Sequence, residues 1–336
     1  MGKVLVIAEA GVNHNGNMDL AYKMIDAAKE MGADILKFQT YVPERLVTRN
    51  APLADYQRKN QAEDSQFEML RKLALSFDEF RALAEYCKKR GMTFMSTPFD
   101  EDSVEFLHTL GMNFWKIPSG EITNYPYLKK IASYGEKVIM STGMSTIDEV
   151  SDAVALLREF GTYDITLLHC TTEYPAPLES VNLCAMDALR EKFNVKVGYS
   201  DHTADIFTAI AAAAHGAQVI EKHFTLDKNL PGPDHKASLT PSEFSEMVLG
   251  IRKVETVWGS GIKEPCEAEL SNRSVARKSI VADLDISKGE IFTEKNLTTT
   301  RPGLGITPMK WNSLIGKTAK RSYKSDERID ESELEE

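Results

Sequence analysis

The chain has 336 residues, more than one average domain, although a barrel fold reaches roughly 250 residues as a single unit. Its hydrophobic share of 42% and charged share of 27% are ordinary for a soluble globular protein. A net charge of −10, without any lysine or arginine run, argues against a nucleic-acid partner. An anionic substrate would therefore require positive side chains gathered at one site.

The cysteines and the N-terminus indicate the compartment. Cys87, Cys170, Cys184 and Cys266 form no CxxC pair and no metal-ligand spacing, which is typical of reduced thiols in a cytosolic protein. The first residues, "MGKVLVIAEAG", reach Glu9 too early for a signal peptide. No apolar run approaches the roughly 20 residues that span a membrane. We expect a soluble, cytoplasmic protein with no membrane partner.

Short apolar segments alternate with helical patterns over most of the chain. The expected strands cover 3–11, 33–41, 92–99, 114–121, 137–144, 165–172, 195–202 and 218–225. Helical spacing of apolar residues appears between them, as over 18–32, where Gly32 supplies the stop. Apolar strands that alternate with helices indicate a parallel sheet covered by helices. Eight such units predict a (β/α)₈ barrel, with an open doubly wound sheet as the alternative.

The pattern changes after a helix expected over 242–259. Residues 261–277 are rich in turn-forming and charged residues, and residues 278–336 contain short strand-like pieces and no long helix. We predict a barrel domain over 1–260, a linker over 261–277, and a second domain over 278–336. A domain of roughly sixty residues is marginal by itself and is expected to lean on a partner surface.

Polar residues follow every expected strand. A barrel carries its chemistry in the loops at the carboxyl ends of the strands. At one strand end such residues usually form a cap or a turn, but eight sets on one face predict a functional site. The eight sets are Glu9 with Asn13 and His14, Lys37 with Gln39, Ser96 with Thr97, Lys116 with Ser119 and Glu121, Ser141 with Thr142, Thr171 with Thr172, Ser200 with His202, and Lys222 with His223.

Two lysines and two histidines stand out among these residues. Lys37 and Lys116 lie on strands, where a buried ammonium group needs an anion nearby. They could pair internally with Glu9 or Glu121, or bind a small multiply charged anion together with the neighbouring serine hydroxyls. His202 and His223, on adjacent strands, would leave positions open on a divalent ion, which makes such an ion a Lewis acid. His235 could compete as a ligand.

Nine motifs in chain order resemble the sialic acid synthase family. They are "IAEAGVNHNG", "ADILKFQTY", "FWKIPSGEITN", "MSTGM", "HCTTEYPAP", "GYSDHT", "EKHFTLD", "PGPDHKASL" and "RPGLGI". The family joins phosphoenolpyruvate to an N-acetylmannosamine-type sugar aldehyde and releases phosphate. The resemblance implies a (β/α)₈ barrel followed by a small domain similar to type III antifreeze protein. It also implies a homodimer in which the small domain caps the partner's barrel.

The resemblance further implies roles for individual residues. His202 and His223 match the protein ligands of Mn²⁺ or Mg²⁺, and Glu121 matches an acidic group near the reacting carbons, our candidate for the proton of the attacking water. The positions that match phosphoenolpyruvate-binding residues are Lys37, Lys116, Ser119, Ser141, Thr172 and Ser200. The positions that match the sugar pocket are Glu9, Gln39, Tyr174 and Asp234, with Arg301 supplied by the small domain of the partner subunit.

The sugar preference rests on one departure within the family. After "HCT", where N-acetylneuraminate synthases commonly carry an asparagine, this chain has Thr172 and Glu173, followed by "YPAP". The sequence resembles bacterial synthases of legionaminic acid, whose substrate is 2,4-diacetamido-2,4,6-trideoxymannose. N-acetylneuraminate synthesis from N-acetylmannosamine is the second reading and pseudaminate synthesis the third. The rivals of other classes are a metal-dependent pyruvate aldolase and a barrel that serves only as scaffold for a carbohydrate-binding small domain.

Overall fold

The computed structural model describes residues 2–54, 58, 63, 65–112 and 114–335. The chain forms two compact units, Met1–Gly259 and Ser260–Glu336. Among the described residues, no helix has both the length and the apolar character needed to cross a membrane.

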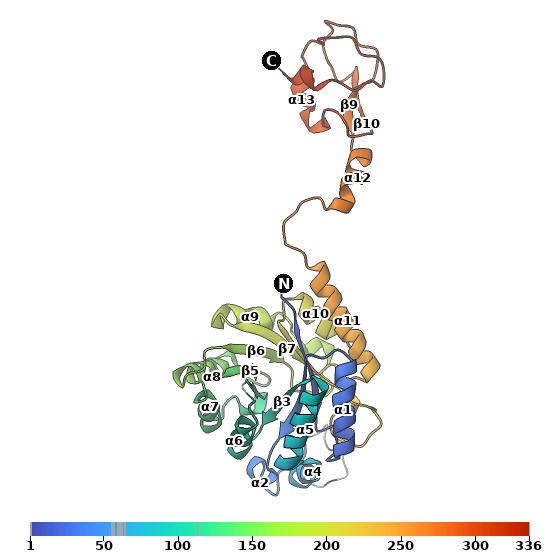
Figure 1. The fold of residues 1–336 in the computed structure, drawn as a ribbon. Coiled ribbons are helices and arrows are strands. Elements are labelled where there is room, and N and C mark those ends of the chain that lie inside the picture. The colour runs from blue at the N-terminus through green and yellow to red at the C-terminus, as the bar shows by residue number, and fades with distance from the viewer. Residues whose placement is uncertain (1, 55–57, 59–62, 64, 113, 336) are drawn as a thin grey trace. The chain divides into compact units, whose positions relative to one another are not determined.

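The first unit is a barrel of parallel strands inside a ring of helices (Figure 1). The strands follow the order β3-β2-β1-β8-β7-β6-β5-β4, and the two end strands β3 and β4 contact each other. Pairing of β1 with β8 joins the first strand to the last, so the open doubly wound alternative is wrong. The strand bounds are β1 Leu5–Gly11, β2 Ile35–Thr40, β3 Thr93–Pro98, β4 Phe114–Ile117, β5 Lys137–Ser141, β6 Ile165–Cys170, β7 Lys196–Asp201 and β8 Val219–His223.

Most of the described helices of this unit begin at side-chain caps that the sequence supplies. Three of them, α5, α8 and α11, begin with a complete capping box, as Ser76 and Glu79 form at α5. Such boxes satisfy backbone N–H groups that the helix leaves free. The bounds are α1 Met18–Glu30, α2 Pro43–Leu46, α4 Gln66–Leu73, α5 Phe77–Arg90, α6 Glu101–Thr109, α7 Tyr125–Ala132, α8 Ile147–Glu159, α9 Ala185–Phe193, α10 Phe207–Ala214 and α11 Pro241–Val257.

The barrel has an apolar interior layer distinct from the main core. The main core lies between the sheet and the helices and includes Trp115, Tyr127 and Phe244. Because successive side chains of a strand point to opposite faces, every second residue of each strand faces the interior. The interior apolar layer consists of Ile7, Ile35, Met95, Ile139, Leu168 and Val219, with Leu5 and Phe114 packed against them.

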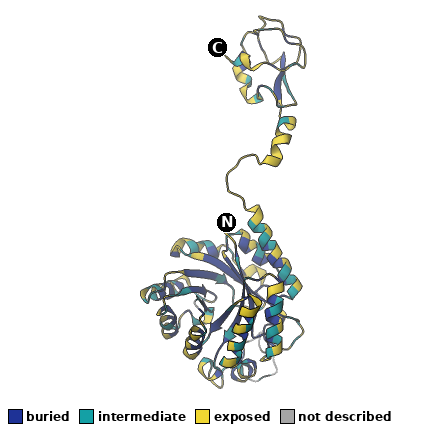
Figure 2. Cartoon of the chain, in the orientation of Figure 1, coloured by how far each residue is buried: buried dark blue, intermediate teal, exposed yellow. Residues whose placement is uncertain are grey.

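The second unit has its own small core. Strands β9 (Ser279–Ala282) and β10 (Leu297–Thr300) pair antiparallel, and their apolar side chains pack with others such as Phe292 and Tyr323. As expected, the described part of this unit after Lys278 holds only short helices, the longest being α13 (Trp311–Leu314) and η5 (Glu331–Leu334). The segment predicted as linker contains a helix, α12 (Glu267–Ala276), none of whose residues is buried (Figure 2).

Candidate active site

A cavity of about 250 Å³ opens at the carboxyl ends of the barrel strands. Its floor is built by the strand register. In every strand except β7, one residue comes two positions after a member of the interior apolar layer, or after Phe114 packed against it, and points in the same direction, one step nearer the carboxyl end. In β7 the corresponding residues are Gly198 and Ser200. We call these eight residues the floor layer, and all of them line the cavity: Glu9, Lys37, Thr97, Lys116, Ser141, Cys170, Ser200 and Glu221.

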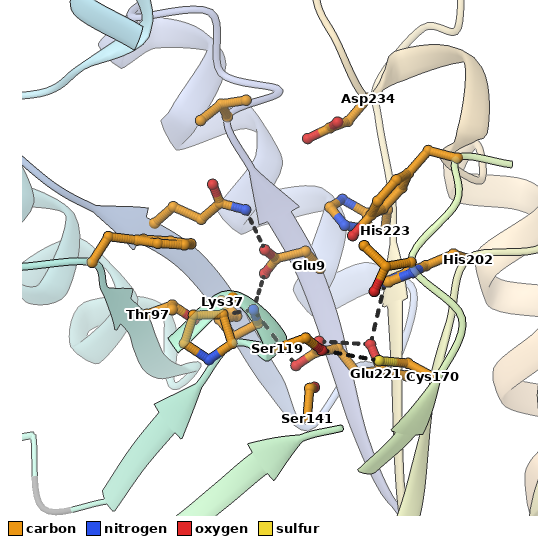
Figure 3. A pocket seen from close by; sticks show the side chains of 18 of the residues that line it. Glu9, Lys37, Thr97, Ser119, Ser141, Cys170, His202, Glu221, His223 and Asp234 are labelled. Carbon is orange, nitrogen blue, oxygen red and sulfur yellow. Dashed lines mark hydrogen bonds and ion pairs between the residues drawn. The ribbon is translucent and has the colours of Figure 1, made fainter. Parts of the chain in front are cut away.

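One carboxylate, that of Glu221, contacts both lysines of the floor layer. Figure 3 shows Glu221, Lys37 and Glu9 together at the cavity floor. The Oε1 atom of Glu221 is 3.6 Å from Lys116 Nζ, and its Oε2 atom is 3.6 Å from Lys37 Nζ. Lys37 also lies 3.0 Å from Glu9 Oε2. All four groups are buried. Two lysine amino groups thus lie beside two carboxyl groups at the centre of the floor layer.

Burial and these contacts shift the pKa values of the four groups in different directions. Burial raises the pKa of Glu9 more than Lys37 lowers it. Burial also opposes ionisation of Glu221, but Lys116 and Lys37 together outweigh it and lower its pKa. Burial lowers the pKa of Lys116, whereas in Lys37 the carboxylates of Glu221 and Glu9 outweigh burial and raise it. Glu221 is therefore the anion that the two lysines share in the absence of a ligand.

Hydroxyl groups complete the cationic side of the floor. Lys116 donates to Ser141 Oγ at 2.7 Å, and Lys37 donates to Thr97 Oγ1 at 3.2 Å. Beyond β4, Ser119 Oγ accepts from the backbone N–H of Gly143 at 2.9 Å. A Cβ atom on Gly143 would lie 2.9 Å from that hydroxyl oxygen and 2.8 Å from Cys170 Sγ. Only glycine fits this approach of two strand ends without displacing its neighbours.

His202 and His223 lie together at one side of the cavity, with ring centroids 5.8 Å apart. His202 donates from Nδ1 to the carbonyl oxygen of Thr171 at 2.7 Å, so the neutral ring presents a lone pair at Nε2. The Nδ1 atom of His223 is buried and has no hydrogen-bond partner in the described structure. Tyr174 stacks on His202 with ring centroids 4.2 Å apart.

Both rings fit the requirements of a divalent cation. Burial lowers the pKa of His202 to about 4 and that of His223 well below its usual value, so both are neutral at pH 7. Neutral imidazole nitrogens with oriented lone pairs are suitable metal ligands. Within the described residues, no group of three or more histidine, cysteine or acidic side chains stands ready to hold a metal. A cation held by these two rings alone would leave positions for other oxygen ligands.

The residues expected in the sugar pocket include four that line the same cavity: Glu9, Gln39, Tyr174 and Asp234. Gln39 donates from Nε2 to Glu9 Oε1 at 3.0 Å, which leaves its amide oxygen for another donor. Asp234 lies at the far side of Glu9 from Lys37 (Figure 3), and burial raises its pKa to about 6. A ligand that donates a hydrogen bond to this buried carboxylate would stabilise its charged form.

Other expected residues lie elsewhere. Glu121 does not belong to the cavity lining that the described residues form; its Oε2 accepts from Asn124 Nδ2 at 2.5 Å. Lys222 faces away from the cavity, because it alternates with Glu221 and His223, and it pairs with Asp201 at 2.8 Å in the packing outside the barrel. Arg301 is an exposed residue of the second unit. In contrast, Ser119 and Thr172, which were expected to bind phosphoenolpyruvate, do line the cavity.

Glu221 and Cys170 are the floor-layer residues that sequence reasoning did not select. Glu221 could have been found from strand alternation, because it lies two positions before His223 and must share its face. Cys170 shares its face with Leu168 by the same rule, and its thiol contacts Ser119 Oγ at 3.3 Å. Burial raises the pKa of this thiol, so it is uncharged at pH 7.

A parallel barrel whose strand ends bring together buried lysines, serine hydroxyls and two neutral imidazoles defines an enzyme suited to a small anionic substrate. The NeuB family model matches residues 24–263, and the SAF domain model matches residues 277–335. The chain belongs to the NeuB family and has the fold of its sialic acid synthases, with a SAF domain at its C-terminal end.

Three relatives illustrate the similarity. The chain is 51% identical to N,N'-diacetyllegionaminic acid synthase of Campylobacter jejuni, over 98% of this chain and 100% of the relative. It is 47% identical to the protein of the same name from Legionella pneumophila, over 93% of this chain and 89% of the relative. A crystal structure of N-acetylneuraminic acid synthetase from Leptospira borgpetersenii superposes with a TM-score of 0.71 at 32% identity, covering 81% of this chain and 90% of that chain.

Proposed function

We propose that this enzyme condenses phosphoenolpyruvate with 2,4-diacetamido-2,4,6-trideoxymannose to form N,N'-diacetyllegionaminate and phosphate. Membership of the NeuB family and the similarity to two legionaminic acid synthases support this reaction. The observation that carries the proposal is the pair of buried lysines that share Glu221 at the cavity floor. Glu221 offsets one of the two ammonium charges, and phosphoenolpyruvate, a small and multiply charged anion, would offset the rest.

The floor layer would bind the anionic reactant. Lys37 and Lys116 would hold its phosphate and carboxylate with help from the hydroxyls of Ser119, Ser141 and Ser200. Thr172 would also bind phosphoenolpyruvate, from the edge of the floor layer. Ammonium groups placed in advance also stabilise the negative charge that develops on the departing phosphate. Glu221 would keep the two lysines charged and in position before the substrate enters.

The opposite end of the cavity would hold the sugar aldehyde. Glu9, Gln39, Tyr174 and Asp234 would accept and donate hydrogen bonds to its hydroxyl and amide groups. His202 and His223 would hold Mn²⁺ or Mg²⁺, and such a cation, when bound, polarises a carbonyl oxygen. Holding both reactants in line contributes to the rate because effective molarities reach about 10⁵ M or more in well-oriented systems.

The bonds change in the following order. The terminal methylene carbon of phosphoenolpyruvate forms a bond to the aldehyde carbon, and positive charge develops at the carbon that bears the phosphate. Water adds there, and the bond between this carbon and the bridging oxygen then breaks, so phosphate leaves. For the proton of the water we propose Glu121, as the family resemblance implies. This role requires its carboxylate to leave Asn124 and turn toward the cavity.

Two further parts of the proposal concern the assembly and the compartment. We propose a homodimer in which Arg301 of one small domain reaches the sugar end of the partner's barrel. We also propose that the enzyme acts in the cytoplasm, where phosphoenolpyruvate is available.

The decisive experiment is a phosphate-release assay with phosphoenolpyruvate, Mn²⁺ and three sugars in parallel. The sugars are 2,4-diacetamido-2,4,6-trideoxymannose, N-acetylmannosamine and the pseudaminate precursor sugar. We expect the first to give the highest kcat/KM, and a higher value for N-acetylmannosamine would assign the enzyme to N-acetylneuraminate synthesis. Phosphoenolpyruvate labelled with heavy oxygen at its bridging position should release labelled phosphate.

The same assay separates the rival aldolase. An aldolase would use pyruvate and release no phosphate, and one acting through a lysine Schiff base would be trapped by borohydride. Turnover with pyruvate, or trapping at Lys37 or Lys116, would reject the proposed reaction.

A further inference from the structure

A further apolar cluster borders the cavity, apart from the floor layer. We call it the rim cluster. It lies apart from the main core and from the barrel interior, and it consists of Val12, Tyr41, Leu53, Met69 and Leu73, with Leu46, Leu70, Ala74 and Phe99 packed against them. Apolar clusters of this kind usually serve only to hold a loop in place.

The rim cluster also forms part of the cavity wall. Five of its members line the cavity: Val12, Met69, Leu70, Leu73 and Phe99. Three of these five come from the single helix α4, and every residue of α4 that lines the cavity is apolar. The wall is thus unlike the floor, where most of the side chains are charged or polar.

Two residues of the wall can be placed from the strand ends. Val12 comes three residues after the floor-layer residue Glu9, and Phe99 comes two residues after Thr97. Both residues come directly after the last residue of their strands, Gly11 and Pro98, so these side chains lie farther toward the mouth than the lysines. Tyr41, within the rim cluster, is close enough to Asp234 for that carboxylate to contribute to raising its pKa, after the larger effect of burial. The wall therefore belongs to the end of the cavity that we assign to the sugar.

The wall is held in a defined place by backbone contacts. Tyr41 donates from its hydroxyl to the carbonyl oxygen of Leu70 at 3.3 Å. Gly16, with φ +67°, passes so close to α4 that an added Cβ atom would lie 2.6 Å from the carbonyl oxygen of Lys72. Only glycine permits this approach at a positive φ. The apolar surface is therefore present before a ligand arrives, as a specificity surface must be.

A substrate group next to this wall would have few hydrogen-bond partners. A hydroxyl group placed there would lose its water and find hydrocarbon instead, which costs binding free energy. A methyl group has no hydrogen bonds to lose there, and its contact with the wall would remove apolar surface from water. The wall consequently distinguishes sugars by the polarity of the carbon that touches it.

We propose that the rim cluster selects sugars whose terminal carbon is a methyl group, and that Met69 and Leu73 are its main determinants. This inference rests on the proposed function, because the anion at the floor directs the reacting end of the sugar inward and its terminal carbon toward the mouth. The selected class is the 6-deoxy sugars, to which 2,4-diacetamido-2,4,6-trideoxymannose belongs and N-acetylmannosamine does not.

The test uses two sugars that differ only at carbon 6: 2,4-diacetamido-2,4,6-trideoxymannose and 2,4-diacetamido-2,4-dideoxymannose, which has a hydroxyl there. Phosphate release with phosphoenolpyruvate and Mn²⁺ gives kcat/KM for each sugar. Apolar pockets reject an added hydroxyl by a factor of about 10² at most, so we expect the unaltered enzyme to prefer the 6-deoxy sugar by about 10- to 100-fold.

Substitution of the wall locates the preference. Met69→Gln and Leu73→Asn keep the side-chain size and add an amide, and each should reduce the preference at least about fivefold, mainly through better use of the 6-hydroxy sugar. Met144→Gln is the matched control, because Met144 lines the cavity but does not belong to the rim cluster. It should leave the ratio of the two kcat/KM values unchanged. Thermal unfolding reports whether each variant is folded.

The outcomes separate the inference from the reaction on which it rests. Equal kcat/KM for the two sugars in the unaltered enzyme would overturn the inference and leave the synthase reaction standing, whatever the variants do. A folded Met69→Gln and a folded Leu73→Asn that both keep the full preference would also overturn it. No phosphate release with any sugar would overturn the proposed function and, with it, the selection by the rim cluster.

Discussion

The floor layer and the rim cluster form two ends of one cavity and are built in different ways. The floor layer takes one side chain from each of the eight strands, and its charges are held by the sheet register. The rim cluster takes its residues from loops and from the short helix α4, and it is apolar. Loops tolerate change more readily than strands that close a barrel. We infer that the floor carries the chemistry and the rim adapts it to one sugar.

The largest effect on activity is expected when a lysine is removed from the floor layer. Lys116→Met should lower the rate of phosphate release by about 10³-fold, because one prearranged donor to a developing charge contributes about that factor. Single-turnover phosphate release measures the effect. The enzyme should stay folded, since Lys37 and Ser200 still contact Glu221.

Lys222 provides a matched control for that experiment. It is also a buried strand lysine, but it points out of the barrel and pairs with the buried Asp201. Lys222→Met should lower the free energy of unfolding by about 3–5 kcal/mol, because it leaves a buried carboxylate unpaired. If Lys222→Met folds and loses as much activity as Lys116→Met, the special role of the floor layer is refuted.

The next prediction concerns His202 and His223, which line the cavity but belong neither to the floor layer nor to the rim cluster. His223→Ala should weaken Mn²⁺ binding, measured by calorimetry, by at least about 100-fold. Loss of a residue that only hydrogen-bonds a metal ligand can already weaken binding by about that factor. His215→Gln, at a surface histidine that pairs with Asp187, should bind Mn²⁺ as before. Unchanged metal affinity in His223→Ala would remove the imidazoles from the proposed cation site.

Arg301 tests whether the sugar end receives a contribution from the second unit. Arg301→Ala should raise KM for the sugar about 10-fold and leave KM for phosphoenolpyruvate unchanged, because a charge-assisted hydrogen bond contributes about 1.5–3 kcal/mol. Arg328→Ala, another exposed arginine of that unit, should change neither value. Mixed dimers of inactive His202→Ala chains and impaired Arg301→Ala chains should have the KM for the sugar of the unaltered enzyme. The raised KM of Arg301→Ala by itself would contradict a shared site.

The last prediction concerns the stability of the fold instead of activity, and it tests Asp234. Burial raises the pKa of this carboxyl from 3.8 to about 6, so the folded protein binds its proton more tightly than the unfolded chain does. Its contribution to stability is therefore greatest below pH 3.8 and is lost as the pH rises through 6. Asp234→Asn should stabilise the protein by up to about 3 kcal/mol at pH 7.5 and by about half as much at pH 5.

Denaturant unfolding at the two pH values measures this difference. Asp201→Asn is a contrasting variant, because Asp201 has a lysine partner within 2.8 Å and should lose stability rather than gain it. An Asp234→Asn variant with the same stability gain at both pH values would show that the carboxylate does not titrate in this range.

Most of the fold could be predicted from the sequence because its signals are local. Apolar runs of strand length and helical spacing gave all eight barrel strands, and each predicted strand overlaps an observed one. The helix α12 was missed because it has no buried residue, and hence no apolar stripe of the kind that sequence reading detects. Lys222 was grouped with the site because counting polar residues at a strand end ignores which face each one occupies.

The site itself could be predicted only in outline. Lysines and histidines at strand ends pointed to an anion and a cation, and Lys37, Lys116, His202 and His223 do line one cavity. The sequence could not show that Glu221 lies between both lysines, because its contacts with Lys116 and Lys37 join residues 105 and 184 positions apart along the chain. Nor could it show that Glu121 turns to Asn124, which depends on the turn after β4.

The sequence by itself determined the alternation of strands and helices, the NeuB-type motifs and the candidate residues, because hydrophobic periodicity and side-chain chemistry are properties of short segments. The tertiary structure alone decided which side chains share a cavity, which charges compensate each other and which apolar residues form a wall instead of a core. Barrel closure is the physical reason: it converts the period of two in each strand into layers that residues distant in the chain build together.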